Sequence, residues 1–226
     1  MLGNRVSAET AVCRRGDAAT RLGRPPAMGM QHVLLEKGRL EAFSDGVIAV
    51  IITIMVLEMK VPRGSDIASL TSVGPTFLAY VLSFVNIAIY WNNHHHMFAA
   101  IKGYDGRSMW ANLHLLFWLS LVPFMTAWLG QNPQATIPTV AYGAVLLLAG
   151  VAYWILETAL IAANGKDSVL ARAVGARFKG RISILLYVIA LPIAFFAPWI
   201  SYALYFVVAA LWFVPDRRVE RELVRE

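Results

Sequence analysis

A few ionisable and amide side chains lie inside otherwise long apolar stretches of this chain, where such groups are costly and usually have a function. Half of them belong to one run, Trp91-Asn92-Asn93-His94-His95-His96, and the others are Asp45, Asn86, Asn112, His114 and Glu157. Imidazole is a common metal ligand, and it titrates near neutral pH. A metal site or a proton relay is therefore the first hypothesis to weigh.

The spacing of the three histidines argues against that metal site. Consecutive residues on a helix point about 100° apart, so His94, His95 and His96 cannot ligate one ion together, and no His-Glu-x-x-His pattern accompanies them. We expect one interior histidine bonded to neighbouring helices and two that face lipid headgroups. The single cysteine, Cys13, excludes an intrachain disulfide and a cysteine metal site. Hydrolase and phosphate-loop motifs are also missing, so we expect neither an enzyme nor a cofactor.

The elements that must position these groups are membrane-spanning helices. Apolar residues make up 58% of the chain and charged residues 15%, and the apolar residues form blocks close to the roughly 20 residues that cross a bilayer. We predict an all-α integral membrane protein with six spans, at about 39–57, 72–98, 108–129, 137–163, 182–197 and 199–214. The last two spans form a tight helical hairpin that is broken near Ala197-Pro198.

The distribution of Lys and Arg predicts the orientation. Eighteen of the 20 basic residues fall in the two terminal segments and in the loops after the second and fourth spans, whereas only Lys60 and Arg63 fall on the other side. Because basic residues favour the cytoplasmic side, we expect both termini in the cytoplasm and the protein in the cell membrane. The topology also explains the net charge of +6, so nucleic acid is not an expected partner.

Two tails flank the predicted six-span domain, which covers residues 37–214. Residues 1–36 are basic and lack a helical apolar stripe, so we expect disorder there. Residues 215–226 form a charged cytoplasmic tail. The sequence leaves three translation starts open, at Met1, Met28 and Met30.

The first span carries a narrow aliphatic stripe. At about 100° per residue, Val50, Ile54 and Leu57 fall within about 60° of one another, with Thr53 beside them. Asp45 falls about 140° from Val50 and should face the packed interior of its own subunit. Such a stripe by itself is most often a lipid-facing or core-facing surface.

Three patterns in chain order carry a resemblance to a known family. They are Arg39-x-x-x-Phe43-Ser44-Asp45 on the first span, Trp91-x-x-His94-x-x-x-Phe98 on the second, and Asn112 with Pro123-Phe124 on the third. Over residues 37–214 the chain resembles the potassium channels related to transmembrane protein 175, of the bacterial type with one six-span repeat.

The resemblance implies a homotetramer in the bilayer whose first spans line a central pore for potassium ions. Rings of apolar side chains, at Val50, Ile54 and Leu57, would form the constriction and hydrophobic gate, and Thr53 would add a hydroxyl ring. Position 50 carries Val where many relatives have Ile or Leu. The resemblance also implies a polar network that fixes the first span against the second and third, made by Arg39, Ser44, Asp45, His94 and Asn112, with Phe43 completing the motif.

Two other function classes stay open beside the passive potassium channel. A secondary or proton-coupled transporter of a small cation would favour broken helices at mid-membrane and an inverted internal repeat. No such repeat relates residues 37–129 to residues 137–214. A non-conducting scaffold subunit would need a partner that the sequence does not indicate.

Overall fold

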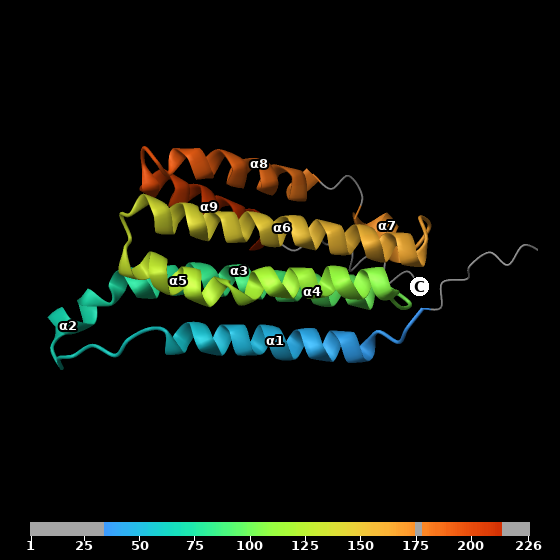
Figure 1. Ribbon diagram of the computed structural model, residues 1–226, viewed down its shortest axis with the longest axis horizontal. Helices are drawn as coiled ribbons and strands as arrows, with labels where there is room; N and C mark the ends of the chain where they lie inside the picture. Colours follow the sequence, from blue (N-terminus) through green and yellow to red (C-terminus); the bar gives the residue numbers. More distant parts are fainter. Residues whose placement is uncertain (1–33, 175–177, 214–226) are drawn as a thin grey trace, which may run out of the picture. The chain divides into compact units, whose positions relative to one another are not determined.

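The computed structural model describes residues 34–174 and 178–213, which are helical apart from short connections (Figure 1). The helices in these residues are α1 (Gly38–Leu57), α2 (Ile67–Ser72), α3 (Gly74–Ala99), α4 (Gly106–Ser120), α5 (Val122–Gln131), α6 (Thr136–Asn164), α7 (Val169–Val174), α8 (Phe178–Ile193) and α9 (Pro198–Phe213). Within the described residues, four stretches are long and apolar enough to cross a membrane, namely α1, α3, α4 with α5, and α6. The described residues thus form an all-helical, multi-pass membrane protein.

The helix α1 packs on α3, α4 and α5, and α6 packs on the other side of α4 and α5 (Figure 1). The hairpin of α8 and α9 contacts α6, and α9 also reaches α3. The larger core joins α1 to α4 and α6 through buried residues such as Ile48, Leu115 and Leu156. A second core surrounds three tyrosines, Tyr142, Tyr187 and Tyr205, between α6 and the hairpin.

The predicted third span, 108–129, is divided into two helices at Leu121. Pro123 explains the break, because it has no N–H to donate and its ring clashes with the carbonyl four residues earlier, that of Leu119. Its position in the first turn of α5 is one that proline favours, and α4 and α5 continue one another along a single candidate span. The predicted third span is therefore one candidate span built from two helices.

The predicted hairpin is present, but its first helix is shifted. The helix α8 runs from Phe178 to Ile193 instead of from 182 to 197. Residues 194–197 form the turn instead, since the position before Pro198 disfavours helix. Each of the two helices has 16 residues.

The short helices α2 and α7 were not expected, because six residues are too few to show a helical apolar period. Asp66 caps α2 by accepting a hydrogen bond from the Ser69 N–H at 3.0 Å. Hydrogen bonding to Ser69 also lowers the pKa of this exposed carboxyl below its ordinary value.

The expected N-terminal tail ends earlier than predicted. Leu35 and Tyr104 exchange backbone hydrogen bonds of 2.8 and 3.2 Å in an isolated antiparallel bridge, so the chain is paired with the α3–α4 loop at Leu35, before the predicted tail ends. Apolar periodicity cannot reveal a single bridge between distant positions. The rest of that tail, residues 1–33, and the predicted C-terminal tail lie outside the described residues.

Candidate pore helix and its buried polar contacts

One face of α1 is packed and the other is exposed. The packed face comprises Leu40, Ser44, Ile48, Ile51 and Met55, all buried against the neighbouring helices. Every residue of the predicted stripe lies on the exposed face, with exposed fractions of 54% for Val50, 40% for Ile54 and 79% for Leu57. A subunit by itself therefore leaves much of this apolar surface exposed.

Thr53 is exposed beside the stripe, and its hydroxyl donates to the carbonyl of Val50 at 2.9 Å. Because this proton is used within the helix, the Thr53 oxygen is left to accept hydrogen bonds or to approach a cation with its lone pairs. The same bond holds the side chain against the helix. The hydroxyl therefore has a fixed position beside the apolar stripe.

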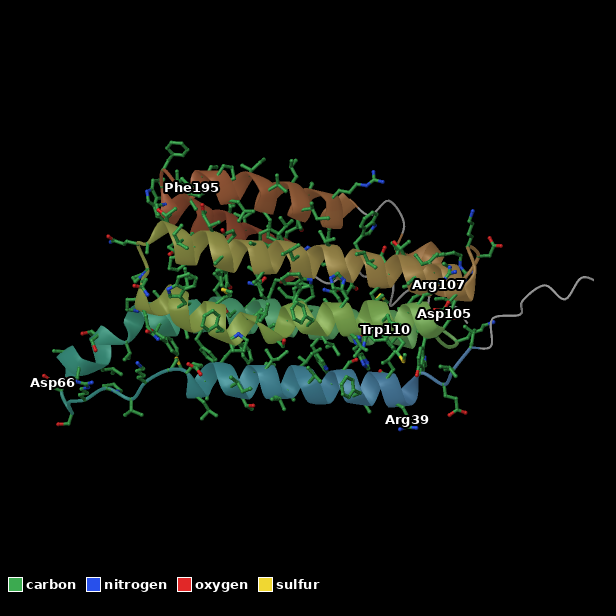
Figure 2. All side chains as sticks on the ribbon, in the orientation of Figure 1. Arg39, Asp66, Asp105, Arg107, Trp110 and Phe195 are labelled. Atoms are coloured by element: carbon green, nitrogen blue, oxygen red, sulfur yellow. The ribbon has the colours of Figure 1, made fainter. Side chains whose placement is uncertain are left out.

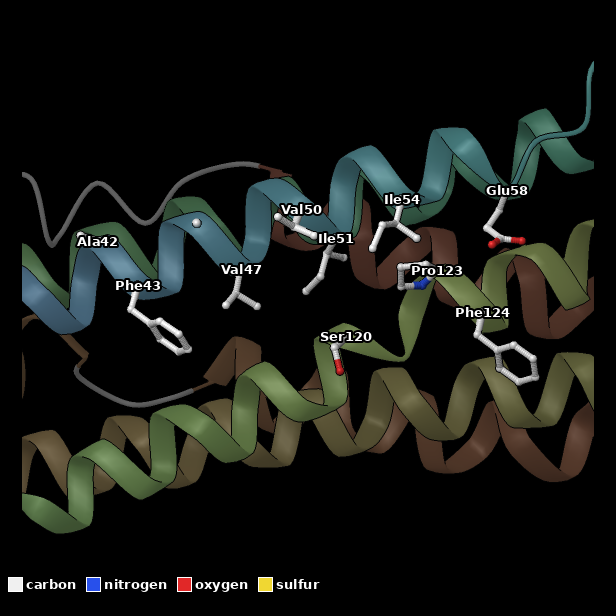
Figure 3. Close-up of a pocket in the computed structure, with 11 residues that line it drawn as sticks. Ala42, Phe43, Val47, Val50, Ile51, Ile54, Glu58, Ser120, Pro123 and Phe124 are labelled. Atoms are coloured by element: carbon white, nitrogen blue, oxygen red, sulfur yellow. The ribbon is translucent and has the colours of Figure 1, made fainter.

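An open groove of about 680 Å³ runs between α1 and the α4–α5 junction (Figure 3). Its α1 side includes Phe43, Val50 and Ile54, and Pro123 and Phe124 line it from α5. Apart from Glu58 at one end and Ser120, the side chains drawn there are apolar. The groove borders the predicted stripe, so apolar exposure on α1 continues onto α5.

A buried chain of hydrogen bonds joins α1, α4 and α3. The Ser44 hydroxyl donates to the carbonyl of Leu40 at 2.8 Å and accepts from Asn112 Nδ2 at 2.8 Å. The amide oxygen of Asn112 therefore faces His94 Nε2, also at 2.8 Å. Because that oxygen can only accept, Nε2 carries the proton and donates. Ser44, Asn112 and His94 all have exposed fractions of 0%.

Asp45 takes part in a different contact. Its Oδ1 accepts from the indole N–H of Trp91 on α3 at 3.0 Å, and the carboxyl is half-buried. One turn earlier on α1, Glu41 Oε1 lies 3.4 Å from His95 Nδ1. The rings of Trp91 and His95 are stacked, with centroids 5.9 Å apart. The contacts of Asp45 with Trp91 and of Glu41 with His95 connect α1 to α3, in addition to the buried chain of Ser44, Asn112 and His94.

Arg39 and Phe43 do not join the buried contacts. Arg39 is exposed, and Figure 2 shows it pointing away from the neighbouring helices. The Phe43 ring is 53% exposed and lines the groove. The spacing of the Arg39-x-x-x-Phe43-Ser44-Asp45 motif explains the difference, because on a helix Ser44 lies about 140° from Arg39. The motif residues thus divide between the packed and exposed faces of α1.

The histidine run has one interior member. His94 is buried and stacked on Phe98, whereas His95 is exposed and His96 is half-buried. Residues 34–174 and 178–213 contain no cluster of three or more His, Cys, Asp or Glu side chains that could hold a metal ion. His114, on α4, is exposed and accepts from Trp118 at 2.9 Å.

Two positioning residues gave no recognisable signal in the sequence. Lys37 donates to three carbonyl groups at the end of α3, and Asn164, the last residue of α6, binds the α3–α4 loop. Their partners lie 61 to 64 residues away along the chain. A lysine just before a membrane span is expected from the preference of basic residues for the cytoplasmic side. The sequence therefore gives no reason to expect its contact with α3, which only the folded structure shows.

The fold and the contacts of α1 define a multi-pass helical membrane protein whose first helix exposes an apolar stripe. Residues 39–123 match the family described as endosomal/lysosomal potassium channel TMEM175. A potassium channel of Chryseobacterium sp. (strain P1-3) is 51% identical over 189 residues, which cover 84% of this chain and 98% of that protein. The chain therefore belongs to this family.

Two further comparisons involve Chamaesiphon minutus. A potassium channel of this organism is 33% identical over 188 residues, covering 77% of this chain and 92% of that protein. The crystal structure of a lysosomal potassium-selective channel TMEM175 homologue from the same organism has a TM-score of 0.69 and 33% identity, and it matches 80% of this chain and 97% of that chain. The family consists of ion channels, so the chain is not an enzyme.

Proposed function

We propose that the chain forms a potassium-permeable channel that conducts passively through a pore lined by α1 from four identical subunits. The observation that carries this proposal is the exposed stripe of Val50, Ile54 and Leu57 on a helix whose other face is fully packed. The relatives that are named potassium channels and match most of the chain support it. Around a four-fold axis, the four copies of each stripe residue would form a ring.

Rings of aliphatic side chains act by size and by water exclusion. An apolar constriction dewets when it is narrow, so small movements of α1 would switch conduction on and off. Leu57 is the most exposed member of the stripe and is well placed to be the narrowest ring. Val50 is shorter than Leu or Ile, so its ring is wider. The fixed hydroxyl of Thr53 gives the pore one polar ring among apolar ones.

The same proposal includes six spans per subunit. Beyond the four long candidates, α8 and α9 would be the fifth and sixth spans, and they carry no Asp, Glu, Lys or Arg between residues 182 and 213. The excess of basic residues on one side supports cytoplasmic termini and a place in the cell membrane. The permeant potassium ion is then the only ligand required, with no cofactor, metal or nucleic-acid partner.

The buried chain of Ser44, Asn112 and His94 has a structural role in this proposal. Interhelical hydrogen bonds inside a membrane hold helices in one register, because an unpaired polar group in hydrocarbon is costly. The Trp91 and His95 contacts with Asp45 and Glu41 add to the connection of α1 with α3. The pore helix would thus be carried on a rigid support.

Potassium flux into liposomes reconstituted with the purified protein tests the proposal. Leu57→Ala should raise the flux, because it widens the narrowest ring, and Thr53→Ala should change the ratio of potassium to sodium flux. Val56→Ala is the matched control, since Val56 is also an exposed aliphatic of α1 but lies about 100° or more around the helix from every member of the stripe. Saturable, gradient-coupled uptake that ignores both substitutions would instead identify a carrier.

A further inference from the structure

The side chain of Lys37, at the residue before α1, ends among backbone carbonyls at the C-terminus of α3. Its ammonium nitrogen lies 2.7 Å from the oxygen of Phe98, 3.2 Å from that of Ala99 and 3.0 Å from that of Ile101. Carbonyl groups at a helix C-terminus lack partners within the helix, and they carry its partial negative charge. One ammonium has three donors, so Lys37 satisfies all three acceptors at once.

The loop after α3 is attached at a second point to the segment that precedes α1. Leu35 and Tyr104 form their two-way backbone bridge two residues before Lys37. Gly103 permits this close approach, because a Cβ atom there would lie 2.7 Å from the Leu35 carbonyl oxygen. The segment that leads into α1 is therefore fixed to the α3–α4 loop at two independent points.

Asn164, at the end of α6, anchors that loop in turn. Its side-chain oxygen accepts from the N–H groups of Lys102 at 2.9 Å and Gly103 at 3.4 Å. Its Nδ2 donates to the Gly103 carbonyl at 2.9 Å and to that of Leu160 at 3.0 Å. We call this set of contacts, made by Leu35, Lys37, residues 98–104 and Asn164, the inner clasp.

The other end of α1 has no comparable attachment. After Leu57, the N–H groups of Glu58 and Met59 bond back to Ile54 and Val56 in α1 itself. Residues 60–65 make no hydrogen bond to α3, α4, α5 or α6 within the part of the chain that the structure describes. Val61 is 86% exposed. The helix is thus tied firmly by the inner clasp at one end and loosely at the other.

We infer that Lys37 is a positioning residue for conduction, because its ammonium fixes the point about which α1 turns. The inference rests on the proposed function, in which α1 lines the pore. Leu57 lies about 30 Å along the helix from Lys37, so a tilt of about 5° moves it by about 2.6 Å. That displacement is larger than a carbon–carbon bond and is enough to change an apolar ring. Loss of the ammonium would release the N-terminal end of α1 from the α3–α4 loop. The side chains of every ring of the stripe would then be held less firmly in place.

Chemical restoration of the charge tests this inference. Lys37→Cys is made together with Cys13→Ser, which removes the only native cysteine. Alkylation with 2-bromoethylamine converts the new cysteine into a lysine analogue with an ammonium group, and iodoacetamide gives a neutral adduct of similar reach. Lys166→Cys, in the loop after α6, exposed and outside the inner clasp, receives both treatments as the matched control.

Two readouts separate the inference from the proposed function. Amide hydrogen exchange at the start of α1 and the end of α3 should be about tenfold faster in the neutral adduct, because a charge-assisted anchor is lost, and it should recover after aminoethylation. The potassium-to-sodium flux ratio should change and recover in parallel, with Lys166→Cys unaffected in both measurements.

Exchange that is equally slow in both adducts would overturn the inference, as it would show that the ammonium does not hold α1. Faster exchange with an unchanged flux ratio would also overturn it, since α1 would then be released without consequence for conduction. Failure of the proposed function itself would appear elsewhere, as a Leu57→Ala protein whose potassium flux matches that of the unmodified chain.

Discussion

Asn112→Ala removes the middle of the buried chain, so Ser44 and His94 lose their hydrogen bonds to it. Two interhelical hydrogen bonds disappear, each worth about 0.6 kcal/mol on average in membrane proteins and up to about 1.7. The Nε2–H of His94 is also left buried without an acceptor, which costs about 1–3 kcal/mol. We therefore expect the free energy of unfolding to fall by about 3 kcal/mol.

Asn86→Ala is the matched control for this substitution. Asn86 is also a buried asparagine, with an exposed fraction of 4%, but its Nδ2 donates within its own helix to the carbonyl of Leu82 at 2.9 Å. Its replacement breaks no bond between helices and strands no donor, so the loss should stay well below that of Asn112→Ala. Unfolding in detergent micelles by steric trapping gives both free energies. Equal losses in the two variants would refute the assignment of Asn112 as an interhelical bridge.

Two further substitutions test the supports of the fold and of α1. Gly143→Ala should destabilise the protein by about 1–3 kcal/mol, because a Cβ there would overlap the Tyr205 hydroxyl, whereas Gly150→Ala, whose Cβ would meet only a hydroxyl at 3.6 Å, should be neutral in a thermal-unfolding assay. Equal melting temperatures would contradict this. Asp45→Ala removes the acceptor of the Trp91 indole N–H, and with it a contact between α1 and α3, and should lower the yield of tetramer on size-exclusion chromatography more than it alters ion preference. A full tetramer yield with a changed ion preference would speak against it.

Sequence patterns anticipated the helical stretches because apolar blocks of about 20 residues are typical of helices that cross a bilayer. The break at Leu121 needed the local chemistry of Pro123, which a hydropathy pattern averages out. The shift of α8 was missed for a similar reason, since composition alone does not show where an apolar stretch of 32 residues turns. The tertiary bridge between Leu35 and Tyr104 has no periodic signature at all.

The residues of the candidate site likewise include some that the sequence predicted and some that it did not. Ser44, Asn112 and His94 were grouped through a family resemblance, and the structure brings them into direct contact. Arg39 was expected among them but points away, because a motif in the sequence does not require its members to share a helix face. Lys37 and Asn164 were missed, since a long-range contact with backbone carbonyls leaves no residue pattern.

The central claim is that the stripe through Ile54 faces an ion pathway at a four-fold axis. Ile54→Cys in the Cys13→Ser background places four thiols in one ring, and soft thiolate ligands bind Cd²⁺ well. Val56→Cys is the control, because Val56 has a similar exposed fraction, 43% against 40%, but lies about 160° around the helix from Ile54. Micromolar Cd²⁺ should block potassium flux through Ile54→Cys reversibly and leave Val56→Cys conducting. Block of Val56→Cys with no effect on Ile54→Cys would contradict the claim.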